Sequence, residues 1–433
     1  MESTGPRVLR HAKDDPSEGP YDVRAIQTTL REGAAILIEE ASMGVKAIIP
    51  RLITVVALLT CAAPISSAAD YANVAIADAH IHLLDFLQNG DYLENGEIVE
   101  KVAGAALPSG QRGKRIEAVL WAMDRANVSH ALVSGMPFLK KWSEDESFRP
   151  AYYLDATSRV VHARDTDYHV ALAIQDFQRA GGETARVQLK RLYPCVSGFD
   201  GTDLGAVDMI AKRMKEFPGV FKCIGEVMSR HDDLTNLTTG ERPRANHPAL
   251  LRIFDFAGEH GIPVSIHHNI APISPGHGLK EPLYLPELLD AFNEFPDTTF
   301  IWCHAGISRR ILVRDLIGHL DRVLADHHNH VIIDLSWVVY PNYILQDLDG
   351  WSALIHRYPD NFVIGSDAVG RFGDYPDQIR IYDALFDALG DPGLIQKLAR
   401  GNFLRIMPDD AVSLDMDYHY PENKYNRQPL TPP

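Results

Sequence analysis

The stretch Ile76-Ala77-Asp78-Ala79-His80-Ile81-His82 is a short apolar run that ends in two histidines one residue apart. Side chains at positions i and i+2 of a β-strand point to the same face, so this stretch, folded as a strand, aims the imidazoles of His80 and His82 at one point. Two imidazoles at a strand end can bind one metal ion. With 19 histidines among 433 residues, roughly one His-x-His pair is expected by chance, and a second pair does occur at His328 and His330. The meaning of the first pair therefore depends on the residues downstream of it in the chain.

Apolar segments alternate with amphipathic segments from residue 76 onward. Strand-like runs cover residues 74–82, 129–136, 169–174, 221–227, 262–268, 299–304, 331–336 and 361–367. Helical patterns cover residues 115–126, 152–165, 176–192, 206–216, 247–259, 285–295, 311–326 and 351–357, and a final pair covers 379–388 and 393–407. This alternation predicts a parallel sheet, and the near-continuous apolar strands predict burial on both faces. The pattern favours an α/β fold of the (β/α)8 TIM-barrel class; a doubly wound sheet is the alternative, but no glycine-rich turn follows the first strand.

Composition excludes some classes of function. The chain is 45% hydrophobic and 23% charged, which is ordinary for a globular protein, and its net charge of −16 argues against a surface that binds nucleic acid. The sequence contains no GxxxxGK[ST] phosphate loop and no Rossmann glycine fingerprint. We therefore expect a small molecule as the partner; the sequence leaves a homo-oligomer open.

The first 69 residues are expected to lie outside the catalytic fold. Residues 43–69 combine a basic start, an apolar run of signal-peptide length and small residues suited to cleavage after Ala68 or Ala69. The apolar run is short for a membrane span, so we expect an exported protein, periplasmic or secreted, with no stable span after cleavage. A buried or anchoring helix is the alternative, which would leave the protein in the cytoplasm. Because a signal peptide begins near the start of a protein, residues 1–42 are interpreted as a non-native or disordered extension before a start at Met43.

The remaining chain is expected to form one barrel at 70–415 and a tail at 416–433. Cleavage would leave three cysteines, Cys195, Cys223 and Cys303. An odd number predicts no disulfide framework.

Polar side chains that can bind a metal end five of the predicted strands. In a (β/α)8 barrel the active site lies at the carboxyl ends of the strands. The first strand ends in His80 and His82, the fourth in Glu226, the fifth in His267 and His268, the sixth in His304 and the eighth in Asp367. A hydrolytic Zn²⁺ or Mn²⁺ site needs neutral imidazoles, a carboxylate and one position open for water. The pattern therefore predicts a site for a divalent metal, Zn²⁺ first and Mn²⁺ second.

These motifs resemble the amidohydrolase superfamily. The resemblance rests on His80-Ile81-His82, on Cys303-His304-Ala305-Gly306, on Gly365-Ser366-Asp367 and on Pro263-Val264-Ser265-Ile266-His267, which is similar to the family's Pro-Val-x-x-His. It covers about residues 74–407 and is closest to the amidohydrolase-related (amidohydrolase 2) branch, which contains lactonases and non-oxidative decarboxylases as well as hydrolases.

The resemblance implies a role for each matching residue. His80, His82 and His267 would bind the metal, with His268 turned to the other face of its strand. Asp367 would bind beside the metal and act as the general base, and His304 would be a ligand or would polarise the substrate. Several relatives carry a carboxylated lysine where this chain has Glu226; a glutamate there can bind or bridge, which leaves one or two ions open. Asp78 is expected to support the site from behind.

Three functions remain open at this point. The first is a metal-dependent hydrolase that cleaves an amide, lactone or ester. The second is a metal-dependent non-oxidative decarboxylase of a small aromatic acid, for which Arg309, Arg310 or Arg371 would hold a carboxylate unless they are solvated loop charges. The third is an exported binding barrel without catalysis.

Overall fold

The computed structural model describes residues 71–103, 106–136, 166–231, 234–235, 241–273, 280–421 and 424, which belong to one unit of the chain. The predicted extension, the predicted signal peptide and the helix expected at 152–165 lie outside these residues. Of the helices within the described ranges, none combines the length and the hydropathy needed to cross a lipid bilayer.

The main strands form one parallel sheet that closes on itself. They are β1 (Ile76–His82), β4 (Val128–Ser134), β5 (Leu192–Val196), β6 (Cys223–Met228), β7 (Val264–His267), β8 (Phe300–Trp302), β9 (Val331–Asp334), β10 (Phe362–Val363) and β11 (Ala368–Val369). Within the described residues, the nine strands of this sheet follow the order β10-β9-β8-β7-β6-β5-β4-β1-β11. The end strands β10 and β11 are two parts of one segment, which pairs with β9 at its start and with β1 at its end. Hydrogen bonds from Ala79 N to Ile364 O (3.0 Å) and from Asp367 N to His80 O (2.9 Å) join this segment to β1. The predicted (β/α)8 barrel is confirmed.

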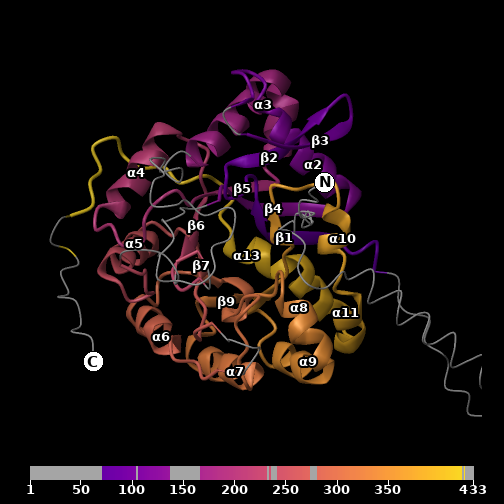
Figure 1. Cartoon of the computed structure of the whole chain (residues 1–433), viewed down its shortest axis with the longest axis vertical. Coiled ribbons are helices and arrows are strands. Elements are labelled where there is room, and N and C mark those ends of the chain that lie inside the picture. The colour runs from indigo at the N-terminus through magenta and orange to yellow at the C-terminus, as the bar shows by residue number, and fades with distance from the viewer. Residues whose placement is uncertain are drawn as a thin grey trace, which may run out of the picture. The chain divides into compact units, whose positions relative to one another are not determined.

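Helices surround the strands. They are α2 (Lys114–Arg125), α3 (Thr166–Leu189), α4 (Ala206–Glu216), α5 (Pro248–Glu259), α6 (Leu285–Glu294), α7 (Leu316–His327), α8 (Val339–Asn342), α9 (Leu348–Arg357), α10 (Tyr375–Ile379), α11 (Asp383–Leu389), α12 (Pro392–Gln396) and α13 (Asn402–Ile406), with short 3-10 or π turns η4 (Cys303–Gly306), η5 (Ile344–Gln346) and η6 (Lys397–Gly401). Helices α4 to α7 and α9 follow one another around the strands (Figure 1). Most of these helices match the predicted ones within a few residues.

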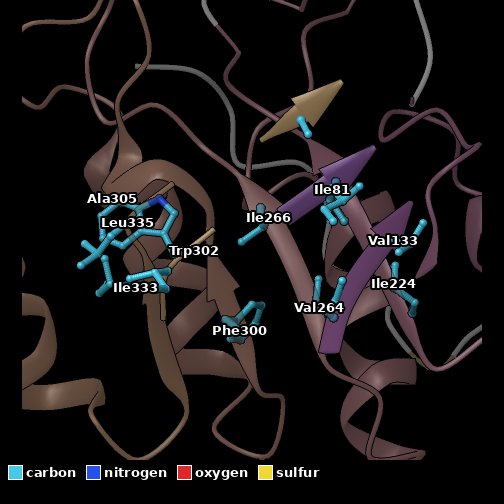
Figure 2. Packing of buried hydrophobic residues seen from close by; sticks show 14 of the residues in the cluster. Ile81, Val133, Ile224, Val264, Ile266, Phe300, Trp302, Ala305, Ile333 and Leu335 are labelled. Carbon is cyan, nitrogen blue, oxygen red and sulfur yellow. The ribbon is translucent and has the colours of Figure 1, made fainter. Parts of the chain in front are cut away.

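Two apolar layers hold the barrel together. The outer layer lies between strands and helices, and Figure 2 shows side chains that neighbouring strands contribute to it, among them Ile81, Val133, Val264, Ile266 and Phe300. The inner layer fills the barrel at the amino ends of the strands; it consists of Ala77, Ala79, Leu132, Tyr193, Cys195, Cys223, Ile301, Ile332 and Val363, with Phe403 and Met407 from the α13 region closing that end. With the amino end filled, the carboxyl end is the place where polar groups can meet.

The third strand was predicted wrongly. Residues 169–174 lie within α3, where Val170, Ala173, Ile174 and Phe177 are buried along one face of the helix. The third strand is instead β5, which contains Pro194. Proline lacks an amide donor and is rare in central strands, which hid this strand from a pattern-based prediction. The carbonyl of Pro194 still accepts a hydrogen bond from Lys222 N at 2.8 Å.

A hairpin follows β1, in a segment where no strand was predicted. Strands β2 (Asn89–Glu94) and β3 (Glu97–Ala103) pair antiparallel. Between them Asn95 and Gly96 have φ angles of 55° and 84°, as a two-residue hairpin turn requires. The buried guanidinium of Arg115 donates to the carbonyls of Gly90 and Val102, one on each strand. The hairpin is thereby tied to α2.

Cys195 and Cys223 form a disulfide bond between β5 and β6, where they are directly opposed in the sheet. The sequence-based expectation of no disulfide framework was wrong on this pair. The parity of the cysteine count carried no information about pairing, because the third residue, Cys303, is buried and free.

Candidate metal centre

His80 and His82 point to the inside of the barrel, as Ala77 and Ala79 do, because β1 is irregular. Ala77 and Ala79 lie in the inner layer and Ile81 in the outer layer, so the alternation of faces breaks at His80, where the pairing with β4 shifts register. Such bulges re-aim side chains beside active sites. The two Nε2 atoms approach to 3.2 Å. The outer nitrogen of each ring is also engaged: Nδ1 of His82 lies 3.2 Å from Gly135 O.

Asp78 supports this strand end rather than the pocket. Its Oδ1 accepts from the amides of His80 (2.9 Å) and Ser366 (3.0 Å), and its Oδ2 accepts from the hydroxyl of Tyr375 (2.8 Å). Burial raises the pKa of Asp78 to about 6, although these hydrogen bonds act in the opposite direction. The carboxylate therefore fastens the first strand to the last segment of the barrel.

Glu226 lies between the histidines. Its Oε2 is 3.4 Å from Nε2 of His82, and its Oε1 is 3.7 Å from Nε2 of His80. The alternation of faces is broken here as well, since Ile224 and Val227, three residues apart, both lie in the outer layer. The intervening Gly225 has a φ of 129°, and a Cβ there would clash with Ser265. The sequence Gly-Glu at this strand end is thus what brings the carboxylate into the pocket.

His267, not His268, faces the pocket. Nδ1 of His267 lies 2.8 Å from Oε1 of Glu226. His268 is equally buried, but its nitrogens contact Ser229 Oγ (2.8 Å) and Tyr284 O (3.0 Å). Burial lowers the pKa of His268 to about 3, so it remains a neutral packing group.

His304 and Asp367 complete the cluster from turns that leave β8 and β10. Both residues have left-handed backbones, with φ of 53° and 54°. This conformation is uncommon outside glycine and persists where the surrounding structure holds it. The ring of His304 stacks on that of His80 at 4.7 Å, and its Nε2 lies 3.9 Å from Oδ2 of Asp367. Oδ1 of Asp367 lies 3.6 Å from Nε2 of both His80 and His82.

Asp367 is the most exposed charged group of the cluster. The side chain of Asp367 is 12% exposed, whereas those of His80 and Glu226 are 2% and 3% exposed. Among these groups Asp367 is therefore the one most accessible to solvent.

Burial and charge act against each other in the pocket. Burial of His80 opposes its protonation, but the charges of Glu226 and Asp367 and the hydrogen bond to Asp334 outweigh burial and raise the pKa of His80 well above its usual value. Burial also opposes ionisation of Glu226, but the charge of His80 and the hydrogen bond with His267 lower the pKa of Glu226 well below its usual value. Burial lowers the pKa of His267 to about 4, which keeps this imidazole neutral. The carboxylate is thus ionised, as a cation ligand must be.

The donors fit a divalent ion. Ligand atoms of three groups lie within 4.8 Å of one another: His80 with Glu226 and Cys303, His80 with His304 and Asp367, and Glu226 with His267 and His304. Imidazole and carboxylate are the donors of hydrolytic Zn²⁺ and of Mn²⁺. Each of His80, His82 and His304 presents Nε2 to the pocket while a carboxylate, carbonyl or hydroxyl engages Nδ1. Such outer partners are typical of metal-binding histidines.

Four residues near the pocket were missed from the sequence. Asp334 ends β9 and lies 2.9 Å from Nδ1 of His80, and Ser336 follows it. Asp334 could have been found, because Val331-Ile332-Ile333-Asp334 is an apolar strand with a carboxylate at its carboxyl end. His231 stacks on His267 at 4.3 Å, and Trp337 contacts His304 edge-on at 5.1 Å. Both lie in loops without a readable motif.

The predicted arginines are placed differently from one another. The guanidinium of Arg309 lies 5.4 Å from the ring centre of Trp337, which itself contacts His304. Arg310 is partly buried in the same turn. Arg371 is partly exposed and lies 3.6 Å from the carboxylate of Asp374. Arg309 is the one that the described contacts connect to the pocket.

One family model and several solved structures are similar to this chain. A family model described as amidohydrolase matches residues 77–406. A comparison with curated protein sequences gave no significant match. Among solved structures, 4-oxalomesaconate hydratase from Rhodopseudomonas palustris is 15% identical, with 77% of this chain and 96% of that chain covered and a TM-score of 0.43. A 2,6-dihydroxybenzoate decarboxylase from Rhizobium is 12% identical (77% and 98% covered, TM-score 0.40), and a dihydroorotase from Campylobacter jejuni is also 12% identical (77% and 82% covered, TM-score 0.41). Similarities of this size do not resolve which reaction this chain catalyses.

Proposed function

Because this chain belongs to the amidohydrolase family, we propose that it is a metal-dependent hydrolase that cleaves an amide, lactone or ester bond of a small molecule. One observation carries the proposal: four imidazoles and two carboxylates from five strand ends form one buried cluster, in which Asp367 is the most exposed group. A buried cluster of this kind is costly without a cation to hold it together.

His80, His82, His267, Glu226 and Asp367 would hold the metal, Zn²⁺ or alternatively Mn²⁺. When bound, the ion would polarise a carbonyl and lower the pKa of water to about 7. His80, His304 and Glu226 each stand in two of the three donor groups. Of these, Glu226 has two carboxylate oxygens, so it would be the shared ligand if two ions bind.

Asp367 and His304 would handle the proton and the substrate. Asp367 is the most exposed of these groups, and its carboxylate would take a proton from the attacking water and pass it to the leaving group. The ring of His304 stacks on that of His80, and His304 would contact the carbonyl oxygen of the substrate. The neutral His267 and the ionised Glu226 keep their protonation states through this exchange.

The second candidate is a metal-dependent non-oxidative decarboxylase of a small aromatic acid. Arg309 favours it, because a cation that rests on Trp337 beside His304 could hold the carboxylate of such a substrate. In that reaction the same pocket would deliver a proton to carbon after loss of CO₂.

The test combines metal analysis with a substrate panel. Purified protein is stripped of metal, reloaded with Zn²⁺ or Mn²⁺ and assayed on lactones, esters, amides and aromatic carboxylic acids, with hydrolysis followed by acid release and decarboxylation by CO₂ release. Metal-dependent hydrolysis supports the proposal, and metal-dependent CO₂ release without hydrolysis supports the second candidate. Absence of bound metal and of any gain on adding metal would refute both and leave the non-catalytic binding barrel.

We also propose that the protein is exported and that its partner is this small molecule. The signal-like residues 43–69 support export, and so does the bond between Cys195 and Cys223, because disulfides persist mainly in oxidising compartments. Mass spectrometry of the secreted protein tests it: the first residue should be Ala69 or Asp70, and a mature chain that begins well before Ala68 contradicts it.

A further inference from the structure

A single carboxylate on β9 connects two histidines of the pocket. Oδ2 of Asp334 lies 2.9 Å from Nδ1 of His80 and 2.6 Å from Oγ of Ser336, and its Oδ1 accepts from the amide of Ser336 at 2.8 Å. Oγ of Ser336 in turn lies 2.8 Å from Nδ1 of His304. Asp334 is fully buried, and Ser336 is as well. Two strand ends, those of β1 and β8, are therefore joined through the end of β9.

The hydrogens along this chain can be counted. An ionised carboxylate only accepts, so the short contact between Asp334 and Ser336 uses the one hydrogen of the serine hydroxyl. That oxygen can then only accept from His304, which requires the proton of the His304 ring to be on Nδ1. The same reasoning places a proton on Nδ1 of His80. Oδ2 of Asp334 contacts Nδ1 of His80 and Oγ of Ser336, and Oδ1 accepts from the amide of Ser336, so all three contacts suit a carboxylate that only accepts.

The carboxylates on the pocket side of His304 do not oppose this assignment. Nε2 of His304 lies 3.7 Å from Oε1 of Glu226 and 3.9 Å from Oδ2 of Asp367. Both distances exceed that of a hydrogen bond, so neither carboxylate claims a proton on Nε2. A neutral His304 thus presents a lone pair to the pocket.

We propose that Asp334, acting through Ser336, is a positioning residue that fixes the ring orientation and the tautomer of His304 together with those of His80, so that both direct Nε2 into the pocket. His304 then accepts a proton from, or coordinates, whatever lies there, and it donates to a substrate oxygen only after it has gained a second proton. The catalytic meaning of this arrangement rests on the proposed function; the tautomer itself does not.

The tautomer can be measured without metal or substrate. Histidine labelled with ¹⁵N reports by NMR which ring nitrogen carries the proton, and a His304→Asn variant assigns the signal. The metal-free protein is recorded at about pH 8.5, about two pH units above the ordinary histidine pKa. We expect a protonated Nδ1 and an unprotonated Nε2 for His304. Protonation on Nε2 in the wild type would overturn the proposal.

Two variants and one control separate positioning from folding. In Asp334→Asn the amide can donate, which frees the hydroxyl of Ser336 to donate to His304, and the proton should move to Nε2; Ser336→Ala should shift it in part. Ser352→Ala removes another buried hydroxyl, which donates to Ala388 O and not to Asp334 or His304, and it should leave the His304 signal unchanged. If neither Asp334→Asn nor Ser336→Ala moves the proton, the proposal fails. If Asp334→Asn does not fold, the wild-type spectrum and Ser336→Ala decide.

The metal provides a second readout. Loss of the outer partner of a metal-binding histidine typically costs about 10- to 100-fold in metal affinity. We expect a loss in this range for Asp334→Asn, measured by chelator competition, and a smaller loss for Ser336→Ala. Unchanged affinity in both variants would contradict the part of the proposal that concerns His80. A protein that shows the expected tautomer but has no activity would refute the proposed function and leave the positioning role intact.

Discussion

The chain contains two His-x-His pairs of identical spacing, and they behave in opposite ways. His80 and His82 lie at the carboxyl end of β1, where Glu226 and Asp367 face them. His328 and His330 lie just before β9 at the amino end of the barrel; Nδ1 of His328 contacts Leu324 O (3.2 Å) and Nε2 of His330 contacts Phe292 O (3.1 Å).

The difference shows that position in the barrel, not the motif, gives histidine its chemistry. Nearby carboxylates raise the pKa of His80 well above its usual value, despite burial. At the other end, burial lowers the pKa of His330. The first pair can exchange protons for a metal, whereas the second pair fills space and satisfies carbonyls.

The largest expected effect, on metal binding and activity, comes from replacing one histidine of each pair by asparagine. His80→Asn should abolish stoichiometric metal binding and with it the metal-dependent activity, because two of the three donor groups contain His80. His330→Asn should leave both unchanged. The measurement is metal content by mass spectrometry together with the rate on a substrate found in the panel. Equal losses in the two variants would show that His80 acts only through folding.

The second-largest effect is expected for Asp367→Asn, which should lower the turnover number. If Asp367 carries the proton, its loss should lower the turnover number by about 10²- to 10⁴-fold. The matched control is Asp374→Asn, an exposed carboxylate that lies 3.6 Å from Arg371 and has no described contact with the pocket. A variant of Asp367 that keeps its turnover number and only loses metal would assign this residue to binding alone.

The sequence predicted the composition of the pocket better than the means by which it is assembled. His80, His267, His304 and Asp367 could be found because each ends an apolar strand. The irregularities in β1 at His80 and in β6 at Gly225 could not be predicted, because a regular strand alternates its side chains between two faces. In a regular β1, Ala79 and His80 could not both point inward, and in a regular β6, Ile224 and Val227 could not both point outward. Asp334 was not predicted as a site residue because the prediction rested on the histidines and did not consider the carboxylate at the end of β9.

The fold was predicted with one error and one omission. The barrel is implied by the alternation of elements, but Pro194 hid β5, and Ala-rich residues 169–174 were assigned to a strand although they belong to a helix. The β2–β3 hairpin was missed even though Asn95-Gly96 is a strong hairpin signal. The local sequence indicates a helix at residues 169–174 and a hairpin turn at Asn95-Gly96. The regular spacing of strands in a barrel favoured a different assignment for both segments.

Metal should also stabilise the fold, through the site that contains His80 and His82 and not through His328 and His330. At a free metal concentration about 1,000-fold above the dissociation constant, binding to the native state adds about 4 kcal/mol to the free energy of unfolding. This gain should be present in wild type and in His330→Asn and absent in His80→Asn, as measured by urea unfolding with and without a chelator. A gain of the same size in His80→Asn would place the bound ion elsewhere.

The smallest effect is the pH dependence of stability in the metal-free protein, which should have opposite signs at the two ends. Because the folded-state pKa of His330 is lowered, the unfolded chain takes up this proton more readily, and His330 costs stability as the pH falls below the unfolded value of about 6.5. Because the folded-state pKa of His80 is raised, His80 contributes stability that is present below about 6.5 and is lost as the pH rises through the folded value. Relative to wild type, His330→Asn should therefore gain stability on acidification and His80→Asn should lose it, each by no more than about 1.4 kcal/mol per pH unit. Urea unfolding at several pH values measures both slopes, and slopes of the same sign would mean that the carboxylates around His80 do not hold its proton.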